Sequence, residues 1–284
     1  HLLRIEKSGY APWSKKITVE PQMVTEFRDI ALVPAPTRIA TSSIAEQALI
    51  TAELAFDHTP NADAIKYRIN ASGDLIATAD AKMLARNVRI FNARNDVILF
   101  IDRNGFLARL VVASGDIVTL GRPGFFLSDT DPSFIYSPTR EVAIIDSGGG
   151  LFLLDASHTI RTITGGVRDA AFNLDGDKLL ITKEHSLDLL WITANEYQPF
   201  QKQWTMETLI EMKSPILEAA WFHEDSAHVV FRTAESIFFA EIDGRGGRNI
   251  HLILSDQIDG LATIPQLPDT VFFLKEKTWY KMEL

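Results

Sequence analysis

A recurring strand meander is the feature that most constrains the fold of this chain. It is clearest from residue 167, in VRDAAFNLDGDKLLITKEHSLDLL, where short apolar runs alternate with polar turns. The three runs cover residues 167–172, 178–182 and 187–192. The residues between them, among them Asn173, Asp175 and Gly176, favour tight turns. The stretch therefore predicts an antiparallel β-meander.

The pattern recurs six times when the copies are aligned on the residue that ends the first strand. These residues are Phe56, Ile90, Phe134, Phe172, Trp221 and Ala262, which lie 34, 44, 38, 49 and 41 positions apart. A period of about 40 residues is that of four-stranded propeller blades. We therefore predict an all-β fold with a six-bladed β-propeller over residues 37–284, and seven blades if the insertion at 195–205 hides extra strands. A long helix within residues 37–284 would contradict this prediction.

The two ends of the repeat region predict how the propeller closes. After the runs at 271–274 and 279–284 the last unit has no residues left for a fourth strand, and an open sheet edge invites aggregation. We expect residues 37–45 to pair beside residues 278–284 and so to close the ring.

Third strands of several units end in an acid that fits the following turn. They end at Asp80, Asp155 and Asp243. We expect each carboxylate to accept hydrogen bonds from that turn.

Composition limits the class of protein. Charged residues make up 23% and apolar residues 46%, which is an ordinary globular balance. The net charge of -9 argues against a general nucleic-acid binder, which needs a basic face. The absence of cysteine excludes disulfides, thiolate metal sites and cysteine nucleophiles. No stretch approaches about 18 uncharged apolar residues, so we expect no membrane span in this chain.

Residues 1–34 predict a separate small β module. Strand-like runs at 2–5 and 17–19 flank a turn at 7–10, and two prolines mark residues 35–36 as a linker. Residues 3–10, Trp13, residues 16–19 and residues 30–34 together resemble the C-terminal half of a PEGA domain. That resemblance implies a small β-sandwich found in bacterial envelope and surface proteins, although the namesake Pro-Glu-Gly-Ala stretch is absent.

The repeat region resembles WD40-like or TolB-like propeller repeats, without the Gly-His and Trp-Asp signature of true WD40 repeats. The PEGA resemblance implies an extracytoplasmic location in a bacterial cell envelope. The chain starts at His1 without an initiator methionine, so we expect a longer native protein with a membrane anchor upstream.

Acidic residues recur three positions before the aligned residue in five of the six units. They are Glu53, Asp131, Asp169, Glu218 and Asp259, and the remaining unit has Asn87. Because first strands line the channel of a propeller, these acids would form a ring at one mouth that could hold a cation or a basic ligand. The alternative is that each acid caps its own turn through a backbone amide.

Histidines and glycines give weaker signals. His223 and His228 flank Glu224 and Asp225 on a predicted turn, but the spacing matches no zinc motif and indicates a solvated hairpin. The glycines at 148–150 and 244–247 fit hairpin turns, and no Gly-Lys-Ser/Thr ending follows them as a phosphate loop requires.

Two further features could contact a partner. Arg245 and Arg248 could meet an anionic group. The insertion at 195–205 carries Tyr197, Pro199, Phe200 and Trp204. These aromatic residues could form a contact patch on a rim loop, or they could pack over a blade edge.

These observations favour a non-catalytic binding or scaffold module that presents a propeller surface to a protein or glycan partner, without a cofactor. No Gly-x-Ser-x-Gly or His-Glu-x-x-His motif is present. The alternative is a propeller hydrolase acting on peptides or polysaccharides, with two acids from different blades at the channel mouth. A third possibility is a cytoplasmic WD40-like assembly hub.

Overall fold

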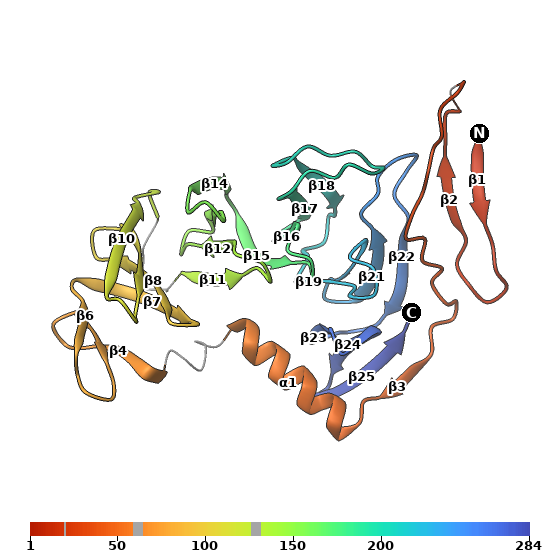
Figure 1. Ribbon diagram of the computed structural model, residues 1–284. Coiled ribbons are helices and arrows are strands. Elements are labelled where there is room, and N and C mark those ends of the chain that lie inside the picture. The colour runs from red at the N-terminus through yellow and green to blue at the C-terminus, as the bar shows by residue number, and fades with distance from the viewer. Residues whose placement is uncertain (20, 59–64, 126–131) are drawn as a thin grey trace. The chain divides into compact units, whose positions relative to one another are not determined.

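The computed structural model describes residues 1–284 except 20, 59–64 and 126–131. The chain divides into two compact units. The first unit consists of His1–Glu53 and Arg168–Leu284, and the second of Leu54–Val167. Strands dominate the ribbon (Figure 1), and α1 (Ile44–His58) is the one α-helix within the described ranges. The predicted all-β class is confirmed.

The second unit contains three antiparallel sheets in chain order. A three-stranded sheet consists of β4 (Tyr67–Ile69), β5 (Leu75–Ala77) and β6 (Met83–Ala85). Two four-stranded meanders follow, the first with β7 (Val88–Arg94), β8 (Val97–Asp102), β9 (Leu107–Val111) and β10 (Asp116–Gly121). The second has β11 (Ser133–Tyr136), β12 (Val142–Ile145), β13 (Leu151–Leu154) and β14 (Ile160–Thr164).

Burial within these meanders rises toward the middle strands. Every residue of β12 and β13 is buried, whereas four of the six residues of the edge strand β10 are exposed. Side chains of a strand point alternately to its two faces, so β12 and β13 are covered on both faces. One apolar cluster joins β8 and β9 to β12 and β13, and another joins β4 and β5 to β7 and β8.

The first unit contains the remaining meanders. One has β15 (Val167–Phe172), β16 (Lys178–Lys183), β17 (Ser186–Trp191) and β18 (Met206–Glu211). The next has β19 (Glu218–Trp221), β20 (His228–Arg232), β21 (Ser236–Glu241) and β22 (Ile250–Ser255). The last has β23 (Gly260–Ile264), β24 (Leu267–Lys275), β25 (Thr278–Glu283) and β3 (Ile39–Thr41). The predicted meander at 167–192 therefore forms as expected, with each run a strand.

The fourth strand of the last sheet comes from the other end of the sequence. β3 pairs antiparallel with β25, with Ala40 opposite Lys281. The expected pairing between residues 37–45 and 278–284 is thus present, while closure of a propeller by it stays a prediction. The described residues form five sheets of four strands, one of three and one of two, so four-stranded units are established and the number of blades stays a prediction. The insertion at 195–205 adds one isolated bridge, between Asn195 and Gln201, and no strand of a seventh blade.

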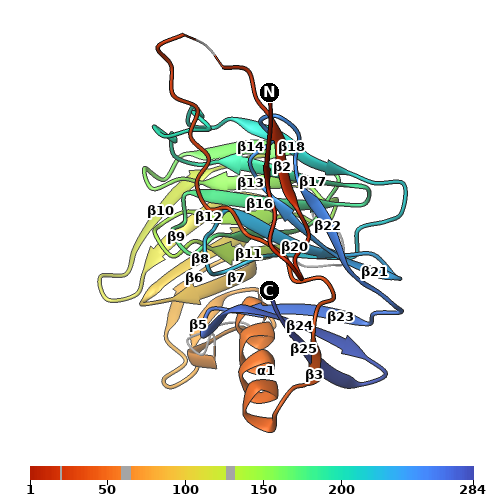
Figure 2. The same cartoon turned by 90° about the vertical axis from the view of Figure 1, so that its right-hand side faces the viewer.

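Helix α1 corrects the prediction for the first repeat. Residues 53–56 were expected to form an inner strand, but they lie in this helix. The helix begins with a capping box, in which Ser43 Oγ accepts from the Glu46 amide and Glu46 Oε2 accepts from the Ser43 amide. Ile50 is buried against Ala262, Ile264 and Phe272, so the helix packs on the β23–β25 sheet (Figure 2). The expectation that residues 37–284 contain no long helix is therefore wrong, and α1 replaces the first predicted strand.

Residues 1–36, here called the N-terminal arm, are packed against the sheets of the first unit. β1 (Leu2–Ile5) pairs with β2 (Trp13–Lys16), so the second strand precedes its predicted position at 17–19. The Trp13 indole Nε1 donates to Glu241 Oε2 at 2.9 Å, and Val33 is buried in the cluster with Phe222 and Phe239. The arm therefore shares a core with the β19–β22 sheet, and the predicted domain boundary at 35–36 stays a prediction.

Candidate functional site

The predicted acids do not share one environment. Glu53 lies in α1, so the prediction that it precedes the end of an inner strand is wrong. Asp131 lies outside the described residues. Asp169 is on β15, where its Oδ1 accepts a hydrogen bond from the Ala170 amide at 2.9 Å. Asp259 Oδ2 accepts from the Glu276 amide at 2.9 Å, which fits the turn-capping alternative.

Glu218 has a different task, because it binds an arginine. Arg232 donates to both Glu218 carboxylate oxygens at 2.8 Å, and also to the carbonyls of Ile258 and Asp259 at 2.9 Å. The Leu261 amide donates to the same Glu218 carboxylate. This network joins β19 and β20 to the start of β23, so its geometry indicates a structural link between sheets. No group of three His, Asp or Glu side chains suited to a metal ion occurs among the residues described, and the acid ring as a cation site stays a prediction.

The two histidines also have structural partners. His228 is buried, its Nδ1 lies 2.5 Å from Asp225 Oδ2, and its ring stacks on Phe239. His223 Nε2 lies 3.3 Å from Thr263 Oγ1, and burial lowers the pKa of this imidazole. The expected solvated hairpin is therefore wrong for both side chains, since they pack into the sheets. Nothing in this arrangement gathers them around a common ligand.

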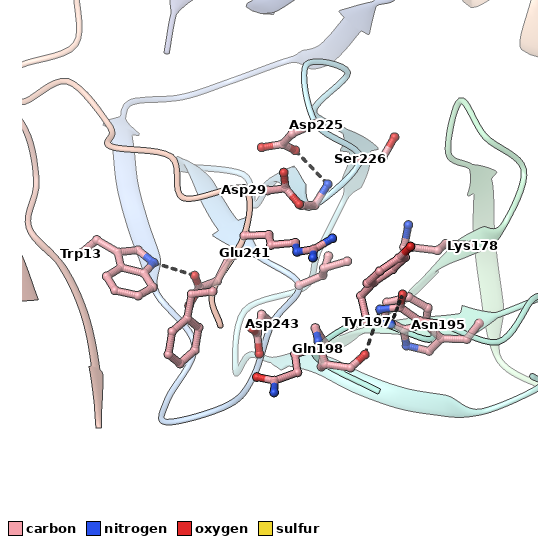
Figure 3. Close-up of a pocket in the computed structure, with 16 residues that line it drawn as sticks. Trp13, Asp29, Lys178, Asn195, Tyr197, Gln198, Asp225, Ser226, Glu241 and Asp243 are labelled. Atoms are coloured by element: carbon pink, nitrogen blue, oxygen red, sulfur yellow. Dashed lines mark hydrogen bonds between the residues drawn. The ribbon is translucent and has the colours of Figure 1, made fainter. Parts of the chain in front are cut away.

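A pocket of about 180 Å³ lies where the N-terminal arm meets the insertion at 195–205 (Figure 3). Its lining comes from the arm (Trp13, Phe27, Arg28, Asp29), from the β15–β18 sheet with its insertion (Lys178, Trp191, Asn195, Tyr197, Gln198, Pro199) and from the β19–β22 sheet (Asp225, Ser226, Ala227, Glu241, Ile242, Asp243). All these residues belong to the first unit. Aromatic rings and charged groups alternate along the wall, which suits a ligand with apolar and polar parts.

Gln198 fastens the arm to the insertion. Its Nε2 donates to the Val24 carbonyl at 2.8 Å, and its Oε1 accepts from the Glu26 amide at 2.9 Å. A carboxamide that donates to one peptide group and accepts from another binds an extended main chain as a neighbouring strand would. Because these bonds span more than 170 positions in sequence, no local pattern could predict them.

Arg245 completes this fastening. Its guanidinium forms a bidentate pair with Asp243, donates to Gln198 Oε1 at 2.7 Å and to the Glu26 carbonyl at 2.8 Å, and lies over the Phe27 ring. Most of its donors are thus engaged within the chain, and the possibility that Arg245 meets an anionic partner stays a prediction.

Arg248 is occupied as well. It donates to the carbonyls of Leu209 and Ile242 and pairs with Glu207 at 3.5 Å. Burial lowers the pKa of this guanidinium. Arg248 therefore links the β15–β18 and β19–β22 sheets, while its buried Nε has no hydrogen-bond partner among the residues described.

Three charged side chains of the pocket, Asp29, Arg28 and Lys178, take no part in this attachment of the arm to the insertion. The Asp29 carboxylate forms no hydrogen bond or ion pair with any residue in the described ranges. Arg28 lies over the Tyr197 ring with its guanidinium carbon 4.5 Å from the centroid, and Lys178 pairs with Asp177 and lies over Trp191. The pocket can thus supply an acceptor at Asp29 beside aromatic surface.

The third-strand acids behave as predicted. Asp80 Oδ1 accepts from the Lys82 amide, Asp155 Oδ1 from the Ser157 and Thr159 amides, and Asp243 Oδ1 from the Arg245 amide. The aromatic insertion could be identified from the sequence, and its residues Tyr197 and Pro199 line the pocket. The arm residues 27–29 could not, because their position at the pocket depends on contacts far along the chain.

Comparisons with known proteins find structures of similar fold. YCF48 from Cyanidioschyzon merolae is 11% identical over 76% of this chain and 78% of its own, with a TM-score of 0.43. The β-propeller domain of Cps50 (Swd1) from Myceliophteria thermophila is 10% identical over 74% and 76%, with a TM-score of 0.42. A gluconolactonase from Xanthomonas campestris is 9% identical over 74% and 78%, with a TM-score of 0.40. Similarities at this level carry no argument about what the chain does.

No family model matches the chain, and no curated protein matches it either. The resemblance to a PEGA domain therefore stays a prediction. Within the described ranges, no helix has the length and apolar character needed to cross a bilayer.

Proposed function

We propose that this chain is a non-catalytic binding module that holds a protein partner beside the pocket between the N-terminal arm and the insertion. The observation that carries the proposal is a group of exposed apolar side chains next to that pocket. They are Met23 at 66%, Val24 at 78%, Tyr197 at 61% and Phe200 at 69% exposure. We call these four residues the arm–insertion surface.

The arm–insertion surface has the composition of a protein interface. Tyrosine, phenylalanine, methionine and arginine are enriched at interfaces, and a few such residues around a pocket usually carry most of the binding energy. The bond from Gln198 to the Val24 carbonyl links the arm segment that carries Met23 and Val24 to the insertion that carries Tyr197 and Phe200. A rigid patch loses little conformational entropy when it binds.

Charge favours a partner with a basic surface. Residues of the first unit include 17 Lys and Arg against 25 Asp and Glu, out of 28 and 37 in the whole chain. Complementary charge raises the rate of encounter and discriminates among partners. In the pocket, the Asp29 carboxylate is placed to accept from an inserted lysine or arginine side chain, with Tyr197 beside its aliphatic stem.

A protein suits this surface better than a glycan. Met23 and Val24 offer aliphatic side chains that form no hydrogen bonds with sugar hydroxyls, and burying them requires apolar atoms on the partner. The hydrolase alternative would need acids free to act in the pocket. Asp29 is one such acid, but the acids that could act with it are engaged. Glu241 binds Trp13, Lys15 and Asn249, Asp243 binds Arg245, and Asp225 binds His228.

An extracytoplasmic location in a bacterial cell envelope, with an anchor upstream, is part of the proposal and is supported by the PEGA resemblance alone. The complete gene would test it. A signal peptide or an apolar helix encoded before His1 would support this location. An upstream coding sequence with neither of these would contradict it.

Site-specific photo-crosslinking in the source cells tests the partner. A crosslinking residue at position 200 should capture a protein, whereas one at position 117, an exposed apolar residue of β10, should not. With that protein purified, Tyr197→Ala should weaken binding about 30-fold, the equivalent of ~2 kcal/mol for a hot-spot residue. Ile117→Ala is the matched control. Equal capture at both positions, or a glycan whose binding depends on Tyr197, would overturn the proposal.

A further inference from the structure

A second pocket, of about 320 Å³, lies wholly within the second unit and is lined by three arginines. Arg89 is on β7, Arg103 is in the turn between β8 and β9, and Arg122 follows β10. Gly105, Gly124 and Phe125 complete its main walls. Arginine side chains that line one cavity repel one another, and an anion bound among them would offset that repulsion.

The β8–β9 turn fixes Arg103 at the pocket. Asp102 Oδ1 accepts from the amides of Asn104 and Phe106, both at 2.8 Å, so this carboxylate is engaged by its own turn. Gly105 has a φ of +82°, which few other residues adopt. The Arg103 guanidinium lies so close over Gly73 that a Cβ there would come within 2.5 Å of Nη2.

Arg122 is positioned from the other side. Its guanidinium carbon is 5.6 Å from the centroid of the Phe106 ring, and its Nε would be 3.8 Å from a Cβ at Gly105. Because Gly105 has no side chain, Arg122 can pack close to its backbone. Gly124 has a φ of +85° and open space where a side chain would be.

The positive charge of the arginines at this pocket contrasts with the net negative charge of the whole chain. The protein has a net charge of -9, while residues 54–167 hold 11 Lys and Arg against 12 Asp and Glu. Arg103 and Arg122 form no ion pair with any carboxylate among the residues described. The inference depends on Arg103 and Arg122. Arg89 lines the same cavity, and the inference does not require Arg89 to lack an ion-pair partner.

We propose that this pocket binds the phosphate group of a small phosphorylated ligand. A guanidinium fork matches two oxygens of a phosphate, and several forks converge better on a tetrahedral dianion than on a carboxylate with two oxygens and one charge. The cavity extends beyond the guanidinium groups to Phe125, where the organic part of the ligand has apolar surface. The site lies outside the residues of the proposed protein-binding surface and does not rest on that function.

Titration calorimetry with inorganic phosphate and with phenyl phosphate tests the proposal. The wild-type chain should bind both with a dissociation constant below ~1 mM, phenyl phosphate more tightly, and acetate at matched ionic strength should not bind. Arg103→Gln and Arg122→Gln should each weaken binding at least tenfold. Arg122→Lys should weaken it too, because the charge remains but the fork is lost.

Arg86→Gln is the matched control, because Arg86 is exposed in the same unit and does not line the pocket. It should change affinity less than twofold, and circular dichroism should confirm that all variants are folded. An equal loss in Arg86→Gln would show general charge attraction and overturn the proposal. Equal affinity for acetate, no phosphate binding, or preference for a single-stranded oligonucleotide over phenyl phosphate would overturn it as well.

Discussion

Replacing Lys15 with methionine should destabilise the first unit strongly. Lys15 is 0% exposed, and its ammonium group pairs with Glu241 and donates to the carbonyls of Asp243 at 2.7 Å and Gly247 at 2.8 Å. Methionine fills a similar volume but supplies no charge and no donor. The buried Glu241 carboxylate and two carbonyls would each lose a partner.

The magnitude follows from the cost of breaking a buried ion pair. Removing one partner of such a pair typically costs ~3–5 kcal/mol, because the other charge stays buried and uncompensated. Glu241 retains donors from the Trp13 indole and from Asn249, which places the expectation toward ~3 kcal/mol. With a urea dependence of about 2 kcal/mol per molar, the unfolding midpoint should fall by about 1.5–2.5 M.

Tryptophan fluorescence is a suitable assay, because all five tryptophans lie in the first unit. They are Trp13, Trp191, Trp204, Trp221 and Trp279. Urea titration followed by fluorescence therefore reports on that unit, without the two-state assumption having to hold for the whole chain. Lys16→Met is the matched control, since Lys16 is the next residue on β2 and is exposed. A Lys15→Met midpoint equal to wild type, or an equal fall in Lys16→Met, would refute the reasoning.

Three further predictions concern the helix and the acids. Ile50→Ala should lower the free energy of unfolding measured in urea by about 2–5 kcal/mol, because it leaves a cavity under α1. A decrease below ~0.5 kcal/mol would contradict the packing of α1 on the β23–β25 sheet. The hydrogen bond from Lys281 lowers the pKa of Glu46 to about 2, so its stabilisation should be complete above pH ~4.5 and be lost as pH falls toward 2. Glu46→Gln should abolish that part of the pH dependence measured by thermal unfolding. Glu218→Ala should lower the free energy of unfolding by about 3 kcal/mol or more, because the buried Arg232 guanidinium loses its carboxylate partner. An unchanged melting curve would contradict this role of the network.

Much of the sheet pattern could be predicted because it is local. The runs at 167–172 and 178–182 alternate with turn residues, and each became a strand at the expected place. The inner strand expected at 218–221 has those bounds in the structure. Turn acids such as Asp155 could also be predicted, because an Asx turn depends on residues only two to four positions away. Antiparallel meanders suit such reasoning, since neighbours in space are neighbours in sequence.

The helix was missed although its signal is present. Ser43 and Glu46 have the spacing of a capping box, and the residues that follow are rich in Ala, Leu, Gln and Glu, which favour helix. The alignment on a period of about 40 residues placed a strand at 53–56 and overrode these local preferences. Sequence repetition can thus indicate that four-stranded units recur without predicting what each segment within a unit becomes.

Both pockets were beyond local reasoning for the same physical reason. The Gln198 bonds join residues 172 and 174 positions apart, and the arginine pocket brings together a strand start, a turn and a post-strand segment. Single arginines give no sequence signal of convergence, because convergence is set by how adjacent strands of a sheet align their ends. Only the aromatic insertion could be identified in advance, since it interrupts the repeat.

The placement of the acids explains why the repeat itself says little about function. Glu218 links two sheets through Arg232 and the Leu261 amide, and Trp221 Nε1 donates to the Ala171 carbonyl of the preceding sheet. These two residues of one unit thus join neighbouring meanders, which the sheets need whatever the protein binds. At the matching position of other units, Asp169 and Asp259 instead accept hydrogen bonds within their own sheets. Binding must then come from segments that differ between units. The arm and the insertion are such segments in the first unit, and their exposed apolar side chains are not needed for any sheet contact. Substitutions at Tyr197 or Phe200 should therefore leave unfolding unchanged while they alter binding, whereas substitutions at Glu218 should do the reverse.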